Sequence, residues 1–200
     1  MNSFNKDDNN YFSILSKIIH QRRSVKPGLM NGGQIPDEQV NELLHLADWA
    51  PTHGNTEPWR FIVYAHDSAK EFSRQHAELY KNNTLPEKFL TDKYEKLISN
   101  GDKASHIIVA IMQRGNLSKV PVIEEIAATA AAVQHILLGA TALGIASMWS
   151  TGGMTHHKAM KDFFQLREED IVMGIIYLGY SEKELSGRRA TPMTEKIKWM

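Results

Sequence analysis

The longest apolar stretch of the chain, Ile126–Met148, constrains the fold most. It is rich in alanine, but Thr129, Gln134 and other polar residues interrupt it, and two glutamates come just before it. A segment that spans a membrane carries few or none of these polar side chains. We therefore expect a long helix over residues 124–144 that is buried in the core of a soluble protein, with no membrane association.

Helix-like and strand-like patterns alternate along the rest of the chain. Apolar residues at helical spacing predict helices over residues 11–21, 36–50, 69–80, 85–100 and 155–164. Apolar runs predict strands over residues 60–65, 106–112, 145–149 and 171–180, with a short last strand over 196–200. The connections between these elements are uneven in length, which favours an α+β or mixed three-layer domain over a regular doubly wound one.

The composition excludes several classes of protein. Lysine plus arginine and aspartate plus glutamate both number 23, so the chain has no global attraction for nucleic acid or an anionic membrane. There is no cysteine, which rules out disulfides and thiol catalysis. Residues 1–10 are polar and lack the apolar core of a signal peptide. We expect a flexible tail over 1–10, a single domain over 11–200 and a cytoplasmic protein.

A cluster of cations follows the first predicted helix and contains Arg22, Arg23, Ser24 and Lys26. Guanidinium groups bind phosphate through paired hydrogen bonds, and a nearby hydroxyl can donate to a phosphate or a sugar-like chain. The competing interpretation is a solvated basic helix end, which the helix dipole favours there.

The loop Ala50–Phe61 contains His53, Asn55, Glu57 and Trp59. An ordinary connection between a helix and a strand uses one or two such side chains to cap backbone groups. This loop has more hydrogen-bonding and aromatic residues than a turn requires, which favours a ligand-binding role.

Two further segments are candidates for ligand contact. The predicted strand that ends at Trp149 continues into Ser150, Thr151 and paired glycines, where backbone N–H groups can approach a ligand closely. The competing interpretation is a plain turn. Arg188 and Arg189 lie near the C-terminus, where a solvated tail is the alternative.

No side-chain catalytic apparatus is recognisable in the sequence. There is no HExxH motif, and His156 and His157 are neighbours that point in different directions on a helix, a poor arrangement for a metal. The GxGxxG and P-loop motifs are also missing. Any chemistry must therefore come from a cofactor.

Taken in order, these segments resemble the nitroreductase family of flavoproteins, in particular its small single-domain bacterial members. The resemblance covers about residues 13–199 and rests on four blocks: Arg22–Lys26, Ala50–Phe61, Trp149–Gly152, and Leu178–Tyr180 followed by Arg188, Arg189 and Pro192. It implies a three-layer α/β/α domain with a mixed, mainly antiparallel sheet. It also implies a homodimer with FMN at the interface, to which the long helix and residues 196–200 would contribute contacts.

The resemblance assigns the cationic cluster to the cofactor. Arg22 and Ser24 would hold the phosphate and ribityl chain of FMN, and Arg23 would contribute its side chain or backbone. Lys26 would reach the pyrimidine edge of the flavin, where a positive charge stabilises the anionic reduced form. Arg189 would reach the phosphate from the C-terminal region.

The other blocks are assigned to the flavin ring. Asn55 would contact the ring, and His53 would reach the FMN of the partner chain. The ring face would be lined by Trp149, Ser150, Thr151 and Gly152. We also include Trp49 in the cofactor site, although some close relatives carry a polar or basic residue there. Glu57 stands where many relatives carry glutamine, so its place is left open.

The implied activity is transfer of hydride from NAD(P)H through flavin N5 to a small acceptor, such as a nitroaromatic or a quinone, in a ping-pong cycle. One alternative is a flavin-binding carrier or sensor without turnover. Another, outside the resemblance, is a structural domain with a basic helix end. Residues 79–102 match the family least, so the resemblance does not identify the acceptor.

Overall fold

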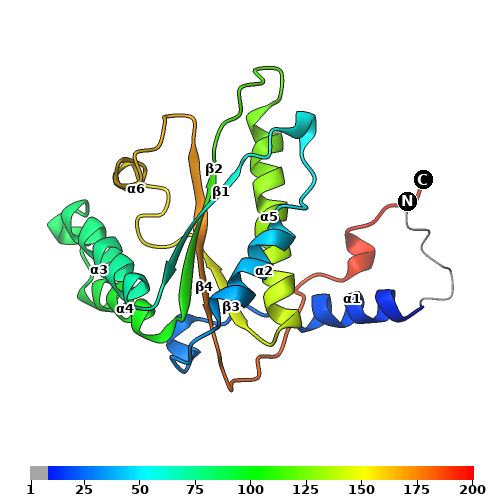
Figure 1. Ribbon diagram of the computed structural model, residues 1–200, viewed down its shortest axis with the longest axis horizontal. Helices are drawn as coiled ribbons and strands as arrows, with labels where there is room; N and C mark the ends of the chain where they lie inside the picture. The colour runs from blue at the N-terminus through cyan, green and yellow to red at the C-terminus, as the bar shows by residue number, and fades with distance from the viewer. Residues whose placement is uncertain (1–8) are drawn as a thin grey trace.

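The computed structural model describes residues 9–200, and its centre is a four-stranded sheet (Figure 1). The strands are β1 (Trp59–Ala65), β2 (His106–Met112), β3 (Ala146–Ser150) and β4 (Ile171–Gly179). Their order across the sheet is β1-β2-β4-β3, and every neighbouring pair is antiparallel. The one parallel contact is an isolated bridge between Ser24 and Ser147, so the sheet is mainly antiparallel as expected.

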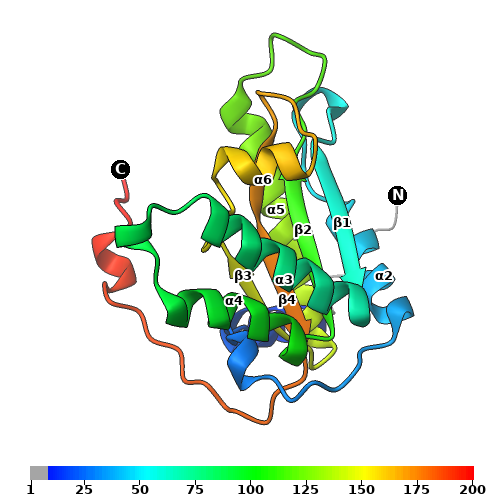
Figure 2. The ribbon, with the colours of Figure 1, turned by 90° about the vertical axis from the view of Figure 1, so that its left-hand side faces the viewer.

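Helices cover both faces of this sheet, which confirms the α/β/α layers. One face carries α2 (Asp37–Ala47) and α5 (Val122–Ala142). The other face carries α3 (Asp67–Asn82), α4 (Thr91–Lys103) and α6 (Lys158–Phe163), which Figure 2 shows in front of the strands. The helix α1 (Asn9–Gln21) extends away from one end of α5, on the same side as the C-terminal segment (Figure 1).

Strand β2 is buried at all seven of its residues because both of its faces meet a helix layer. Ile108, Ala110 and Met112 pack in the core toward α2 and α5. Ile107, Val109 and Ile111 pack in the core toward α3 and α4. This two-sided burial is why the strand reads as an unbroken apolar run in the sequence.

The helix α5 forms the core of its layer. By length and hydropathy alone it is the one helix in residues 9–200 that could span a membrane. It packs instead along the sheet and against α2, as the polar interruptions in its sequence predict. A Cβ at Gly139 would lie 2.8 Å from Leu43 and 2.7 Å from Leu46, so the glycine permits the close approach of α2 and α5.

The ends of the chain differ from the expectations. Helix α1 begins at Asn9, inside the predicted tail 1–10, and residues 1–8 lie outside the described part. The predicted strand over 196–200 is wrong for the single chain. A 3₁₀ turn, Met193–Glu195, precedes these residues, and their own backbone is irregular. A strand needs a neighbouring sheet edge, and Figure 1 shows this segment far from the sheet of its own chain.

Two predicted helices also differ in their bounds. The helix expected over 85–100 is interrupted, because Pro86–Lys88 forms a 3₁₀ turn and α4 begins only at Thr91. The short helix expected to begin at a Thr155 cap begins at Lys158. The ring nitrogen Nδ1 of His157 accepts a hydrogen bond from the N–H of Ala159 and so caps the start of this helix.

Candidate functional site

A pocket of about 290 Å³ lies between α4 and the end of β3. Three of the residues assigned to the cofactor line it: Lys26, Ser150 and Gly152. Residues of α3, α4 and β4 also line it: His76, Lys93, Lys96, Leu97, Asn100 and Tyr177. The first group comes from the predicted ligand-binding segments, and most of the second comes from the segment 79–102 that matches the family least.

Lys26 reaches this pocket because the cationic cluster runs beside β3. The N–H of Val25 donates to the carbonyl of Ser147 over 2.9 Å, and Ser24 bridges the same residue. Pro27 then begins a 3₁₀ turn, Pro27–Leu29, and lines the pocket with Lys26. A short backbone pairing therefore fixes the position of the lysine.

The loop after β3 is held by a buried histidine. His76 on α3 is 2% exposed, and its Nε2 accepts the backbone N–H of Met154 over 3.0 Å. Burial, with a smaller contribution from Lys93, lowers the pKa of His76 from 6.5 to about 4, so the ring is neutral near pH 7. Gly153 has a φ of 68°, and a Cβ there would lie 2.3 Å from His76 Nε2. The loop can approach the imidazole only because this residue is glycine.

Tyr177 on β4 contributes a neutral hydroxyl to the pocket. Burial raises the pKa of this phenol to about 12, although a hydrogen bond from Asn100 opposes the shift. The Nδ2 of Asn100 donates to that hydroxyl over 3.5 Å. Both groups can therefore offer hydrogen bonds to a ligand without carrying charge.

Trp149, which the resemblance assigns to the ring face, does not line this pocket. Successive side chains of a strand point to opposite faces, so Met148 and Ser150 reach the pocket and Trp149 points to the other core. Its Nε1 donates to the carbonyl of Met173 over 3.0 Å, and the ring covers Gly174. Thr151 is exposed and does not line the pocket.

The arginines assigned to the phosphate lie outside this pocket. The Nε of Arg23 donates to the carbonyl of Leu185 over 3.1 Å, and its guanidinium packs against Gly187 of the C-terminal segment. It lines a separate pocket of about 460 Å³ beneath that segment. Arg22 is partly buried, and Arg189 is exposed, with its guanidinium donating to the neighbouring carbonyl of Arg188.

His53, Asn55 and Trp49 lie on the α2 and α5 side of the chain, away from the Lys26 pocket. The Nδ1 of His53 is 2.5 Å from a carboxylate oxygen of Glu124 at the start of α5. Trp49 is 86% exposed and lines an apolar groove with residues of α1 and α5. The loop carries three positive φ angles, at Gly54, Asn55 and Glu57. Such strained backbone is concentrated at ligand-binding sites.

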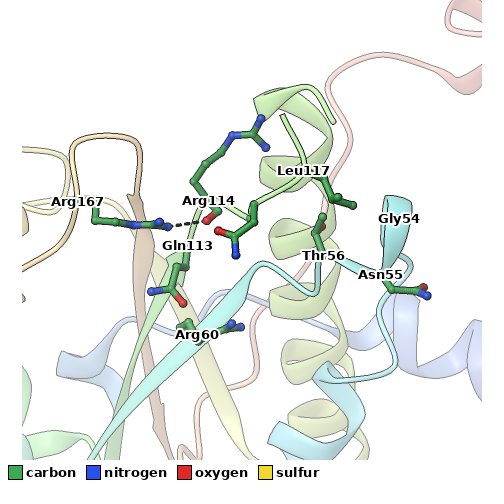
Figure 3. A pocket seen from close by; sticks show the side chains of 10 residues that line it. Gly54, Asn55, Thr56, Arg60, Gln113, Arg114, Leu117 and Arg167 are labelled. Carbon is green, nitrogen blue, oxygen red and sulfur yellow. Dashed lines mark hydrogen bonds between the residues drawn. The ribbon is translucent and has the colours of Figure 1, made fainter. Parts of the chain in front are cut away.

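A larger pocket, of about 510 Å³, lies at the other end of the sheet and is drawn in Figure 3. It is lined by Asn55 and by three arginines, of which Arg60 donates to the backbone carbonyls of Glu57 and Trp59. The other two arginines have carboxylate partners. Arg114 pairs with the buried carboxylate of Glu125, and Arg167 pairs with Asp170 at 2.9 Å. Burial raises the pKa of Asp170, but hydrogen bonds from Arg167 and Arg114 outweigh it and hold the pKa below its usual value. This arrangement stabilises the fold at that end and leaves the Lys26 pocket as the candidate site.

Comparison with known proteins identifies the family. The model of the nitroreductase family matches residues 19–180. The chain belongs to the nitroreductase family. A curated relative from Bacillus subtilis (strain 168), "Putative NAD(P)H nitroreductase YfhC", is 23% identical over 185 residues, which cover 92% of this chain and 93% of the relative.

Solved structures agree with this family membership. A nitroreductase-like family protein from Bacillus cereus matches with a TM-score of 0.79 and 26% identity, over 93% of this chain and 95% of that one. The FMN-dependent nitroreductase NfnB from Mycobacterium smegmatis, solved in complex with NADPH, matches with a TM-score of 0.70. It is 15% identical, over 95% of this chain and 99% of NfnB, so this likeness concerns the fold alone. The expected family and fold class are therefore confirmed, and the roles of individual residues remain predictions.

The sequence interpretation missed the wall built by α3 and α4. Lys93, Lys96 and Asn100 have the spacing i, i+3, i+7, which places them on one face of a helix. That signal was available, but the sequence does not indicate which face of α4 meets the pocket. His76 has no local signal, because only the folded chain brings it to Met154.

Proposed function

We propose that this member of the nitroreductase family is an FMN-dependent oxidoreductase that uses NAD(P)H to reduce a small acceptor such as a nitroaromatic or a quinone. The observation that carries the proposal is the meeting of Lys26 with the end of β3, Ser150 and Gly152, in one pocket. The family resemblance assigns both segments to the flavin. The FMN and NADPH of the fold relative NfnB support the same chemistry.

The residues of the pocket fit a flavin. Gly152 and Gly153 leave room for a planar ring to approach the backbone, and Met148 and Leu97 offer apolar contact. Lys26 supplies a cation for the ring edge that becomes negative on reduction. FMN, when bound, supplies the hydride and electron transfer that no side chain of this chain provides.

The proposed role of each residue follows the family resemblance. Lys26 and Ser150 orient the ring, and Arg22 and Ser24 hold the phosphate and ribityl chain. A volume of about 290 Å³ lies at the lower end for a ligand pocket, so we infer that a second chain completes the site. His53 would act there, on the FMN of the partner, and Asn55 and Trp49 stay assigned to the cofactor site.

A homodimer is proposed on the basis of the exposed apolar surface. Trp49 and several residues of α1 and the C-terminal segment are large, apolar and exposed: Phe12, Leu15, Ile19, Ile197 and Trp199. Beside Trp49 lies an apolar groove of about 370 Å³ between α1, α2 and α5. Monomers seldom expose apolar patches of this kind, and a second copy of the chain would cover them. The single FMN-binding domain over residues 11–200 and the cytoplasmic location also remain predictions.

The test is turnover by the FMN-loaded protein. We expect steady oxidation of NADPH or NADH that depends on an added nitroaromatic or quinone. The Arg22→Ala variant should bind FMN at least about tenfold more weakly, because a charged hydrogen bond to phosphate is lost. Arg74→Ala is the matched control, since Arg74 pairs with Glu71 on the exposed side of α3. A protein that binds FMN but oxidises neither nucleotide with any acceptor would favour the carrier or sensor alternative.

A further inference from the structure

The basic and acidic residues of α4 differ in whether they line the Lys26 pocket. Lys93 and Lys96 line the Lys26 pocket, and they share this face of the helix with Leu97 and Asn100. The acidic residues of the same helix are absent from the pocket lining: Asp92, Glu95 and Asp102. The lining contains three lysines and not one carboxylate, although the chain as a whole has no net charge.

The three lysines have no counter-charge within residues 9–200. Lys26, Lys93 and Lys96 are exposed, and none of them takes part in a salt bridge there, whereas the exposed Lys70 and Lys158 do. Like charges that share a pocket repel one another, and an anion relieves this repulsion. The pocket is therefore electrostatically complementary to a negatively charged group.

Lys93 is also held in place by an aromatic ring. Its Nζ lies 4.5 Å from the centroid of the Tyr80 ring, within the range of a cation–π contact. Tyr80 is buried, and its hydroxyl accepts the N–H of Leu90 over 3.0 Å, which fixes the ring at the start of α4. This contact restricts the position of the Lys93 ammonium group.

We propose that Lys93 and Lys96 form an anion-binding subsite for the small molecule that binds over the cofactor. The inference rests on the proposed function and goes beyond it by naming a substrate class. Lys26 comes from the segment beside β3 and is assigned to the flavin, whereas Lys93 and Lys96 come from α4. The lysines are flexible point charges, which suit carboxylates and phosphates of varied shape. Two molecules carry such a group: the nicotinamide dinucleotide through its phosphates, and an acceptor through a carboxylate.

The test compares charged and neutral substrates of the same shape. The FMN-loaded wild type and a Lys93→Gln/Lys96→Gln variant are assayed with 4-nitrobenzoate and with 4-nitrobenzamide as acceptors. Each is also assayed with NADPH and with 1-benzyl-1,4-dihydronicotinamide, a donor that carries no phosphate. Lys103→Gln is the matched control, because Lys103 ends the same helix and does not line the pocket.

We expect kcat/KM of the double variant to fall about tenfold for the anionic member of one pair and to change less than about twofold for its neutral counterpart. A fall confined to 4-nitrobenzoate identifies the acceptor as the source of the anion, and one confined to NADPH identifies the donor. Added salt should reduce the wild-type preference.

Equal losses with charged and neutral substrates would overturn the inference. So would a weaker affinity of the double variant for FMN, because the lysines would then belong to the cofactor site. A wild type that turns over neither the charged nor the neutral substrates would overturn the proposed function itself. An active wild type without charge preference would overturn only the subsite.

Discussion

The Nε2 atom of His76 on α3 accepts a hydrogen bond from the backbone N–H of Met154, 3.0 Å away in the loop after β3. The bond is buried and connects two walls of the candidate site. It requires a neutral imidazole, since a protonated ring has no acceptor. The shape of the pocket therefore depends on a histidine that remains unprotonated.

Replacement of His76 by phenylalanine should leave the Met154 N–H buried without an acceptor. An unsatisfied buried donor costs about 1–3 kcal/mol, so we expect the free energy of unfolding to fall by that amount. His76→Gln keeps an acceptor oxygen and should lose less. Urea denaturation of both variants measures the effect, and equal losses would show that ring packing, not the hydrogen bond, matters at this position.

The same histidine predicts a dependence of stability on pH. Burial first, and Lys93 second, lower the pKa of His76 to about 4 in the folded chain, whereas an unfolded chain has the ordinary value of 6.5. Between these values the unfolded state binds more protons, so the stability contributed by the neutral ring falls as pH drops from 6.5 and is lost below 4. At pH 5 this loss is roughly 2 kcal/mol. The difference in unfolding free energy between pH 7 and pH 5 should therefore be smaller in His76→Gln than in the wild type, and an unchanged difference would contradict the assignment.

The pair Arg114–Glu125 should contribute strongly to stability. Glu125 is 1% exposed and also accepts the N–H of Gly115 over 3.1 Å. Glu125→Gln removes the charge that balances Arg114, and the loss of one partner of a buried pair costs about 3–5 kcal/mol. Asp162→Asn is the control, because its pair with Lys158 is exposed and should contribute less than about 1 kcal/mol. Thermal or urea unfolding that shows equal effects for the two variants would be inconsistent with a buried network.

Assembly can be tested at Trp49. This side chain is 86% exposed beside the apolar groove of α1, α2 and α5. Trp49→Asp places a charge in the proposed interface and should shift the protein from dimer to monomer in analytical ultracentrifugation. Leu85→Asp is the matched control, because Leu85 is exposed on the connection between α3 and α4, on the other face of the sheet. A wild type that sediments as a monomer would rule out the dimer directly.

The sequence predicted the parts of the fold in which a local pattern coincides with burial. Strand β2 was predicted at its true bounds because both of its faces are buried and all its residues are apolar. The C-terminal strand was not found in the single chain, because strand formation depends on a neighbouring edge that the isolated segment lacks. The helix predicted over 85–100 begins only at Thr91, because the 3₁₀ turn Pro86–Lys88 occupies its first residues. The charged pattern of the sequence does not mark this boundary.

The candidate site was predictable only in part, for a similar reason. Lys26 and Ser150 come from segments with recognisable residues and do line the pocket, and their contact with a cofactor stays a prediction. Trp149 does not line the pocket because a strand alternates its faces, and sequence alone does not tell which face meets the pocket. His76 and Lys93 enter through the packing of α3 and α4 against β3 and β4, a relationship between distant segments with no local signal.

We propose that this chain binds FMN and that a reduced nicotinamide reduces the bound flavin. The most direct measurement is the visible absorption spectrum of the purified, FMN-incubated protein, before and after anaerobic addition of NADPH and, separately, NADH. We expect flavin bands that remain with the protein through gel filtration and bleach when one of the nucleotides is added. A protein that retains no flavin, or whose flavin bands persist with both nucleotides, would contradict it.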